Sequence, residues 1–341
     1  MTDQKPITYI EREIGDTVIE PWDWQPCKVI TSGDVLEHVV FKRKREGSPI
    51  IKLDADHYIE ASTGEIKEFV HAETKADAVS NVQETLARLR RIINANCTDP
   101  ERIRWVTLTY RQENGQPMTD PKRVQRDYEE LWRRLKTYCK RKEYGIPEYI
   151  TVMEPQGSGA WHLHCVWIWQ TKAPIIPKNA DALKLLKLPD DEPTLESMWR
   201  QGFVQIKSCA NCDNLGAYFS AYLADMSTEE LAAAAGSPGI LSTIDPETVK
   251  QKTASDGSTK KYIKGARLKF YPPGLNIYRC SRGIQRPSEE WMSYEEAKKT
   301  LPVGARSTFK KHVSVITYET EGAPGKEAAS VTTIYYNTKQ R

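Results

Sequence analysis

Two histidines and a glutamate have the spacing of a metal site. His162 and His164 are separated by one residue, and Glu154 precedes His162 by eight positions. Two imidazoles and one carboxylate can bind a divalent cation such as Mg²⁺, Mn²⁺ or Zn²⁺ while leaving coordination positions open. The spacing does not name the metal, and a His-x-His pair without a further ligand is more often incidental.

The segment around these residues predicts a β-hairpin. The strands expected at Glu148–Glu154 and Trp161–Trp169 flank a turn-rich stretch, Pro155–Gly159. Side chains alternate faces along a strand, so both histidines share one face, and Glu154 joins it in either of two registers, opposite His162 or opposite His164. The other face of the second strand is apolar and is expected to pack against helices; it carries Trp161, Leu163, Cys165, Trp167 and Trp169.

Tyr218 and Tyr222 offer a nucleophile. They are four residues apart in a segment that predicts a helix from about Asp213 to Met226, so their phenols share one helix face. Small neighbours, among them Gly216, let this helix approach a surface closely. A phenol is a weak nucleophile at neutral pH, and a divalent cation on a phosphodiester offsets this weakness. In isolation, the pair also fits two half-buried aromatic residues that pack on a sheet.

The predicted elements around these residues alternate strand and helix. Periodicity and capping signals place a central antiparallel sheet between helices, an α+β fold. The expected strands outside the hairpin are Arg102–Tyr110, Phe203–Lys207, Arg267–Tyr271 and Leu275–Cys280, and the expected helices outside the tyrosine segment are Thr74–Ala95, Pro121–Lys142 and a broken one at Ala180–Arg200.

Basic residues are concentrated in two stretches. Between Gly257 and Ser288 there are eight Lys or Arg and no Asp or Glu, and Leu86–Tyr144 holds fifteen basic and eight acidic residues. Such local excess predicts a surface that binds a polyanion, although a single basic run also fits a solvated helix face. The candidate DNA-binding residues are Lys207, Lys260, Lys261, Lys264, Arg267, Lys269, Arg279 and Arg282.

Length and composition bound the class of protein. The chain has 341 residues, 39% of them hydrophobic and 28% charged, which excludes wholesale disorder. It has no apolar run long enough to cross a membrane and no signal-peptide pattern at its start. Seven cysteines without framework spacing suit a reducing cytosol. We therefore expect a soluble cytoplasmic protein, in which Cys209 and Cys212 are structural.

Together these segments resemble the HUH endonucleases, specifically the rolling-circle replication initiators of plasmids and single-stranded-DNA viruses. Three segments carry the resemblance in family order: Val106–Tyr110 matches the strand that ends in Thr and an aromatic residue, His162–His164 matches the His–hydrophobe–His motif, and Tyr218–Tyr222 matches the helix with two tyrosines. In several viral initiators a glutamate at the offset of Glu154 completes the metal site.

The resemblance implies a metal-dependent, sequence-specific enzyme that nicks and rejoins DNA. Glu154, His162 and His164 then hold Mg²⁺ or Mn²⁺, Tyr218 makes the first attack, and Tyr222 makes the second transfer. The substrate is single-stranded or hairpin origin DNA. The chain has no G-x-x-x-x-G-K-[ST] loop, so a host helicase and a host polymerase are the expected partners.

One position departs from the family pattern, and two other functions stay open. Many relatives carry Lys three residues after the first tyrosine, where this chain has Ala221, so Lys207 or a cation in the 260s must take its place. A relaxase or transposase uses the same chemistry. A non-catalytic nucleic-acid-binding module needs neither the histidines as ligands nor the tyrosines as nucleophiles.

The expected organisation has three parts. A strand-rich extension occupies residues 1–72, the nuclease domain occupies 73–286 with a mobile insertion at about 227–258, and an appendage occupies 287–341. The Ala-, Ser- and Gly-rich composition of the insertion separates it from the rest of the domain. The roles of the two terminal regions do not follow from the sequence.

Overall fold

The computed structural model divides into two compact units, one formed by Met1–His71 with Arg286–Arg341 and one by Ala72–Gln285. Within them the structure describes residues 20–42, 50–54, 57–60, 65–68, 79–207, 209, 214–227, 230, 249–253, 259–263, 265–272, 274–317 and 326–339. Residues 1–72 and 287–341 were treated as separate regions in the sequence analysis. Here they contribute to one unit, because strands from both belong to the same sheet.

A five-stranded antiparallel sheet organises the unit of Ala72–Gln285. Its strand order is β13-β7-β8-β6-β9, and the strands are β6 (Ile103–Tyr110), β7 (Glu148–Pro155), β8 (Trp161–Ile168), β9 (Gly202–Lys207) and β13 (Tyr278–Cys280). Helices cover the sheet, which confirms the predicted α+β class.

The central hairpin has one of the two predicted registers. β7 and β8 pair antiparallel, with Glu154 directly opposite His162 and Val152 opposite His164. On the far side of β8, strand β6 places Thr107 beside His164 and Thr109 beside His162. One face of three adjacent strands therefore carries the polar groups.

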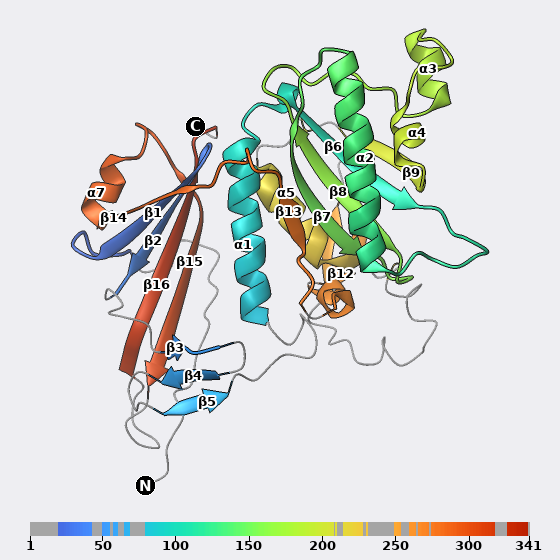
Figure 1. Cartoon of the computed structure of the whole chain (residues 1–341). Helices are drawn as coiled ribbons and strands as arrows, with labels where there is room; N and C mark the ends of the chain where they lie inside the picture. Colours follow the sequence, from blue (N-terminus) through green and yellow to red (C-terminus); the bar gives the residue numbers. More distant parts are fainter. Residues whose placement is uncertain are drawn as a thin grey trace. The chain divides into compact units, whose positions relative to one another are not determined.

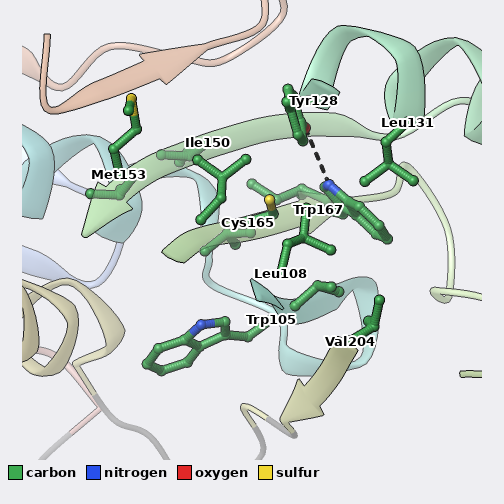
Figure 2. Packing of buried hydrophobic residues seen from close by; sticks show 14 of the residues in the cluster. Trp105, Leu108, Tyr128, Leu131, Ile150, Met153, Cys165, Trp167 and Val204 are labelled. Atoms are coloured by element: carbon green, nitrogen blue, oxygen red, sulfur yellow. Dashed lines mark hydrogen bonds between the residues drawn. The ribbon is translucent and has the colours of Figure 1, made fainter. Parts of the chain in front are cut away.

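Helix α2 (Pro121–Arg141) packs on the opposite, apolar face. Asp120 caps it by accepting the N–H of Lys122, as its position before Pro121 indicates. The indole N–H of Trp167 donates to the Tyr128 hydroxyl at 3.3 Å, and Figure 2 shows Tyr128 and Leu131 among the side chains of this core. In Figure 1, α2 lies along β7 and β8. All five apolar side chains predicted to face helices are buried.

Helices α1 (Val79–Asn96) and α5 (Leu215–Ala224) belong to the face that carries the histidines. Phe219 of α5 contacts the ring of Trp105, with 4.8 Å between centroids, and the ring of His164, with 5.9 Å. Gly216 packs tightly on α1, where its N–H donates to Asn94 Oδ1 at 3.0 Å. The small residue predicted to permit close approach does so.

The other elements of this unit are short. They are η1 (Pro100–Arg102), α3 (Ala180–Leu186), α4 (Leu195–Trp199), β10 (Met226–Ser227), β11 (Val249–Thr253), β12 (Thr259–Ile263) and η4 (Ala266–Phe270). Strands β10, β12 and β11 form a separate small sheet that includes part of the predicted insertion. Of the predicted elements, the helix start at residues 74–78 lies outside the described residues.

The predicted strand at Arg267–Tyr271 is wrong, because most of this segment is the 3₁₀-helix η4. Arg267 donates to the carbonyl of Pro155, and the Tyr271 hydroxyl donates to the carbonyl of Met153. Both partners lie at the end of β7, only two residues apart. A helical turn brings side chains at positions i and i+4 to about 5–6 Å from each other, whereas a strand separates them by about 13 Å.

The unit formed by the two terminal regions contains two sheets. Strands β14 (Ser288–Ser293), β1 (Pro26–Ser32), β2 (Val35–Phe41), β16 (Lys326–Asn337) and β15 (Ser307–Thr317) are neighbours in that order, and helix α7 (Tyr294–Lys299) packs on this sheet. Strands β3 (Ile50–Lys52), β4 (His57–Glu60) and β5 (Ile66–Glu68) form the second. The predicted strand character of the N-terminal region is confirmed.

Candidate metal centre and tyrosine helix

Glu154 and His164 are in direct contact inside the protein. Glu154 lies on β7 and is 1% exposed, and His164 lies on β8 and is fully buried. A hydrogen bond of 2.5 Å joins Oε2 of the carboxylate to Nε2 of the imidazole. Charge-assisted hydrogen bonds of this kind are short and strong, so the two side chains hold each other in place.

Thr107 of β6 fixes the other side of the His164 ring. Its hydroxyl oxygen lies 3.1 Å from Nδ1 of His164. Because the carboxylate can only accept, Nε2 of the ring carries the proton in this arrangement and Nδ1 accepts from the threonine hydroxyl. A threonine hydroxyl can also accept from Nδ1, which is the arrangement in which the lone pair of Nε2 can bind a metal ion.

His162 lies one step further along β8 and is partly exposed. Burial lowers the pKa of its imidazole, and the attraction of Glu154 offsets this only in part, so the pKa stays below its ordinary value. The ring is therefore neutral at pH 7. Neutral imidazole is the form that binds metal ions.

The carboxylate of Glu154 is ionised. Burial alone raises its pKa, but the hydrogen bond with His164 and the charges of His164 and Arg267 outweigh burial, and the pKa of Glu154 lies below its ordinary value. Its second oxygen, Oε1, lies 3.1 Å from a guanidinium nitrogen of Arg267. That oxygen accepts no hydrogen bond from the part of the chain that the structure describes.

The donor set fits a divalent cation in its chemistry. Two imidazoles and an ionised carboxylate share one face, and an oxygen of the carboxylate accepts no hydrogen bond within the described residues. In this arrangement, however, the described residues include no group of three His, Cys, Asp or Glu side chains placed to hold a metal ion. Glu154 is instead engaged by His164 and Arg267, so the three-ligand centre stays a prediction.

The helix predicted to carry the nucleophiles is α5, which includes Tyr218 and Tyr222. The side chains of both tyrosines lie outside the described residues. The same helix places Phe219 against His164. Helix α5 therefore packs over the face that carries Glu154, His162 and His164, which is the placement that attack on a metal-bound phosphate requires.

The predicted DNA-binding residues have different environments. Lys261, Arg279 and Arg282 are exposed, and the ammonium of Lys207 lies 5.3 Å from the centre of the Trp105 ring. Arg267 is instead 5% exposed and lies inside the site. Lys264 and the side chains of Lys260 and Lys269 lie outside the described residues.

Glu230 is a residue of this region that sequence reasoning missed. Its two carboxylate oxygens each accept a 2.8 Å hydrogen bond from Arg267. It falls in the segment interpreted as a mobile insertion, whose composition hides a single acidic residue with a defined partner. Tyr110, the aromatic residue of the first motif, was not assigned a role; its hydroxyl donates to Asp127 of α2 at 3.2 Å, on the face opposite the histidines.

An α+β sheet with a His-x-His strand beside a carboxylate strand, and a tyrosine-bearing helix over the same face, is the arrangement expected of Rep-type initiators. Residues 103–227 match a family model of replication-associated proteins, the ORF2 type. The match confirms the resemblance to Rep-type rolling-circle initiators and supports a role in the initiation of DNA replication, with DNA as the partner. Comparisons with curated proteins and with solved structures gave no match. Among the described helices, none is long and apolar enough to cross a membrane.

Proposed function

We propose that this protein initiates rolling-circle replication by nicking and rejoining origin DNA in a metal-dependent reaction. The observation that carries the proposal is the pair of Glu154 and His164 on adjacent strands, with α5 packed against the same His164 through Phe219. The family match supports the replication role. Mg²⁺ or Mn²⁺ is the proposed cofactor, and cytoplasmic DNA replication is the proposed setting.

In the proposed reaction Glu154, His162 and His164 hold the cation. When bound, the cation withdraws charge from the non-bridging oxygens of the scissile phosphate. The phenol oxygen of Tyr218 attacks phosphorus and forms a phosphotyrosine bond to the 5′ side, while the bond from phosphorus to the 3′ oxygen breaks. The phenol loses a proton and the departing 3′ oxygen gains one, which leaves a free 3′-hydroxyl for a host polymerase.

The covalent intermediate conserves the energy of the phosphodiester bond. A later attack by a 3′-hydroxyl on the phosphotyrosine reverses the first step and rejoins a strand without ATP. Two tyrosines on one helix allow a second cleavage while the first adduct is still attached, and we assign that second transfer to Tyr222. A host helicase supplies unwinding.

Covalent capture of DNA tests the proposal. The full chain is incubated with Mn²⁺ and labelled single-stranded oligonucleotides that tile the DNA flanking its gene, and adducts are resolved by denaturing electrophoresis. We expect an adduct to one oligonucleotide that disappears with Tyr218→Phe, or only with the double change to Phe, and with Glu154→Gln. Retention of the oligonucleotide in a native gel without any adduct, under Mg²⁺ and Mn²⁺ alike, would support the binding module instead.

Genetic context separates the replication initiator from a relaxase or transposase. All three use the same chemistry, but the family match favours replication. A plasmid that carries only the nicked sequence and this gene is expected to replicate through single-stranded intermediates. Transfer of the plasmid between cells without such replication would identify a relaxase.

A further inference from the structure

Arg267 is a buried guanidinium that ties together three parts of the site. It is 5% exposed. It donates to the carbonyl of Pro155 at the end of β7 and to the carbonyl of Asp225 just after α5, at 2.8 and 3.2 Å. It also donates to both oxygens of Glu230, at 2.8 Å each. A buried arginine is stable only when its charge and donors are matched in this way.

The same guanidinium also reaches the proposed metal ligand. Its Nη2 atom lies 3.1 Å from Oε1 of Glu154. The other oxygen of that carboxylate is bonded to His164. Among the described residues, Arg267 is thus the positive charge at the carboxylate oxygen that accepts no hydrogen bond. A cation that binds at Glu154 must compete with Arg267 for this oxygen.

Arg267 has two carboxylate partners of unequal quality. Glu230 binds it through two parallel hydrogen bonds and is 23% exposed, whereas Glu154 is 1% exposed and contributes only a charge contact to it. Paired geometry of this kind is the stronger attachment of an arginine. Loss of the contact with Glu154 therefore leaves the guanidinium held by Glu230 and two carbonyl oxygens.

We propose that Arg267 is an internal counter-cation, which neutralises Glu154 in the metal-free protein and yields its Oε1 atom to the divalent cation while Glu230 retains the guanidinium. The inference rests on the proposed function, since it takes Glu154 as a metal ligand. Arg267 is in this account a positioning residue, which keeps a buried carboxylate ionised and correctly placed until the metal arrives. Its charge also opposes the metal, and Glu230 tunes that opposition.

Two substitutions are expected to change metal affinity in opposite directions. Arg267→Met keeps the length of the side chain but removes the charge, so we expect the metal-free full chain to bind Mn²⁺ about tenfold more tightly by isothermal titration calorimetry. Glu230→Gln removes the stronger partner of Arg267 and leaves its charge with Glu154, so we expect Mn²⁺ affinity about tenfold weaker.

Matched controls separate competition from general damage. Arg88→Met removes a surface arginine that pairs with Glu84 on α1, and it is expected to leave Mn²⁺ affinity unchanged. Arg267→Lys retains the charge and is expected to stay closer to the natural protein than Arg267→Met. Weaker or unchanged binding in Arg267→Met would overturn the inference, and if that variant does not fold, unchanged or tighter binding in Glu230→Gln would overturn it.

A thermal measurement gives a readout that does not depend on activity. In EDTA, Arg267→Met leaves two carboxylates without their partner and is expected to lower the melting temperature. Added Mn²⁺ should then raise that temperature by more than it does in the natural protein. If the natural protein binds Mn²⁺ in a way that Glu154→Gln does not weaken, the proposed metal site itself fails; if only the Arg267 and Glu230 effects are missing, the inference alone fails.

Discussion

At the scale of single residues, the site is a chain of paired polar groups across three strands. Thr107 of β6 contacts His164 of β8, and His164 contacts Glu154 of β7. Each link leaves a defined atom for its neighbour, so the ring of His164 has one orientation. Residues that hydrogen-bond a metal-binding histidine in this way typically set its orientation and basicity.

Replacing Thr107 with Val should weaken metal binding while the fold persists. Valine has nearly the same shape but cannot hydrogen-bond Nδ1 of His164, so the ring loses its orienting partner. We expect Mn²⁺ affinity to fall by about 10- to 100-fold in calorimetry. Thr151→Val is the matched control, because Thr151 is similarly buried but lies on the opposite face of β7. Equal effects of the two changes would contradict the role of Thr107.

At the scale of elements, the position of α5 depends on its contact with α1. A methyl group added at Gly216 lies 2.4 Å from the carbonyl oxygen of Arg90 and 2.6 Å from Oδ1 of Asn94. Both distances are below what carbon atoms tolerate, and the nearer atom belongs to the backbone. Helix α5 can approach α1 this closely only with glycine at position 216.

Gly216→Ala is therefore expected to shift α5 away from α1. We expect a loss of about 1–3 kcal/mol in the free energy of unfolding, measured by urea denaturation. The yield of covalent DNA adduct should fall further than the stability alone explains, because α5 carries the proposed nucleophiles. A variant with natural stability and natural adduct yield would show that the close contact does not position the helix.

The sequence predicts the sheet side of the site better than the segments after α5. Strict alternation in β8 and the phase of Glu154 are local properties, so the hairpin and its shared polar face follow from them. The 3₁₀ turn at Arg267 and the partner Glu230 do not, because both arise from contacts between residues 37 positions apart or more. A basic residue in a basic stretch has the same signature whether it lies on the surface or inside.

At the scale of the whole chain, the two compact units have separate cores. In the unit of Met1–His71 with Arg286–Arg341, His38 is fully buried and neither of its ring nitrogens has a hydrogen-bond partner in the described part of the chain. Its ring packs against Tyr294 of α7 and Tyr336 of β16, at 6.2 and 5.0 Å between centroids. Burial lowers the pKa of His38 from 6.5 to about 4.

Acid should therefore destabilise this unit through His38. Between pH 6.5 and about 4 the unfolded chain binds a proton that the folded unit does not, so the free energy of unfolding falls as pH falls through that window. The full effect is about 3 kcal/mol. Urea denaturation of His38→Leu should lose this part of the pH dependence, whereas His57→Gln, a change at a more exposed histidine, should keep it. An unchanged profile in His38→Leu would contradict the assignment.

The basic surface should make DNA binding strongly dependent on salt. Lys261 is exposed on β12, within the basic stretch. If it contacts a phosphate, Lys261→Ala weakens binding to all single-stranded sequences alike and lowers the slope of log K against log salt by about 1. Fluorescence anisotropy at several salt concentrations measures this. Lys298→Ala on α7, in the other unit, is the control, and equal slopes for both variants and the natural protein would exclude a phosphate contact at Lys261.

The central claim is that Glu154, His162 and His164 bind one divalent cation beneath α5. Anomalous X-ray scattering from crystals of the full chain grown with Mn²⁺ tests it most directly. The account predicts a single strong peak within about 2–2.3 Å of the Glu154 carboxylate and of one nitrogen on each imidazole. A peak that lacks these ligands, or no peak at saturating Mn²⁺, would contradict it.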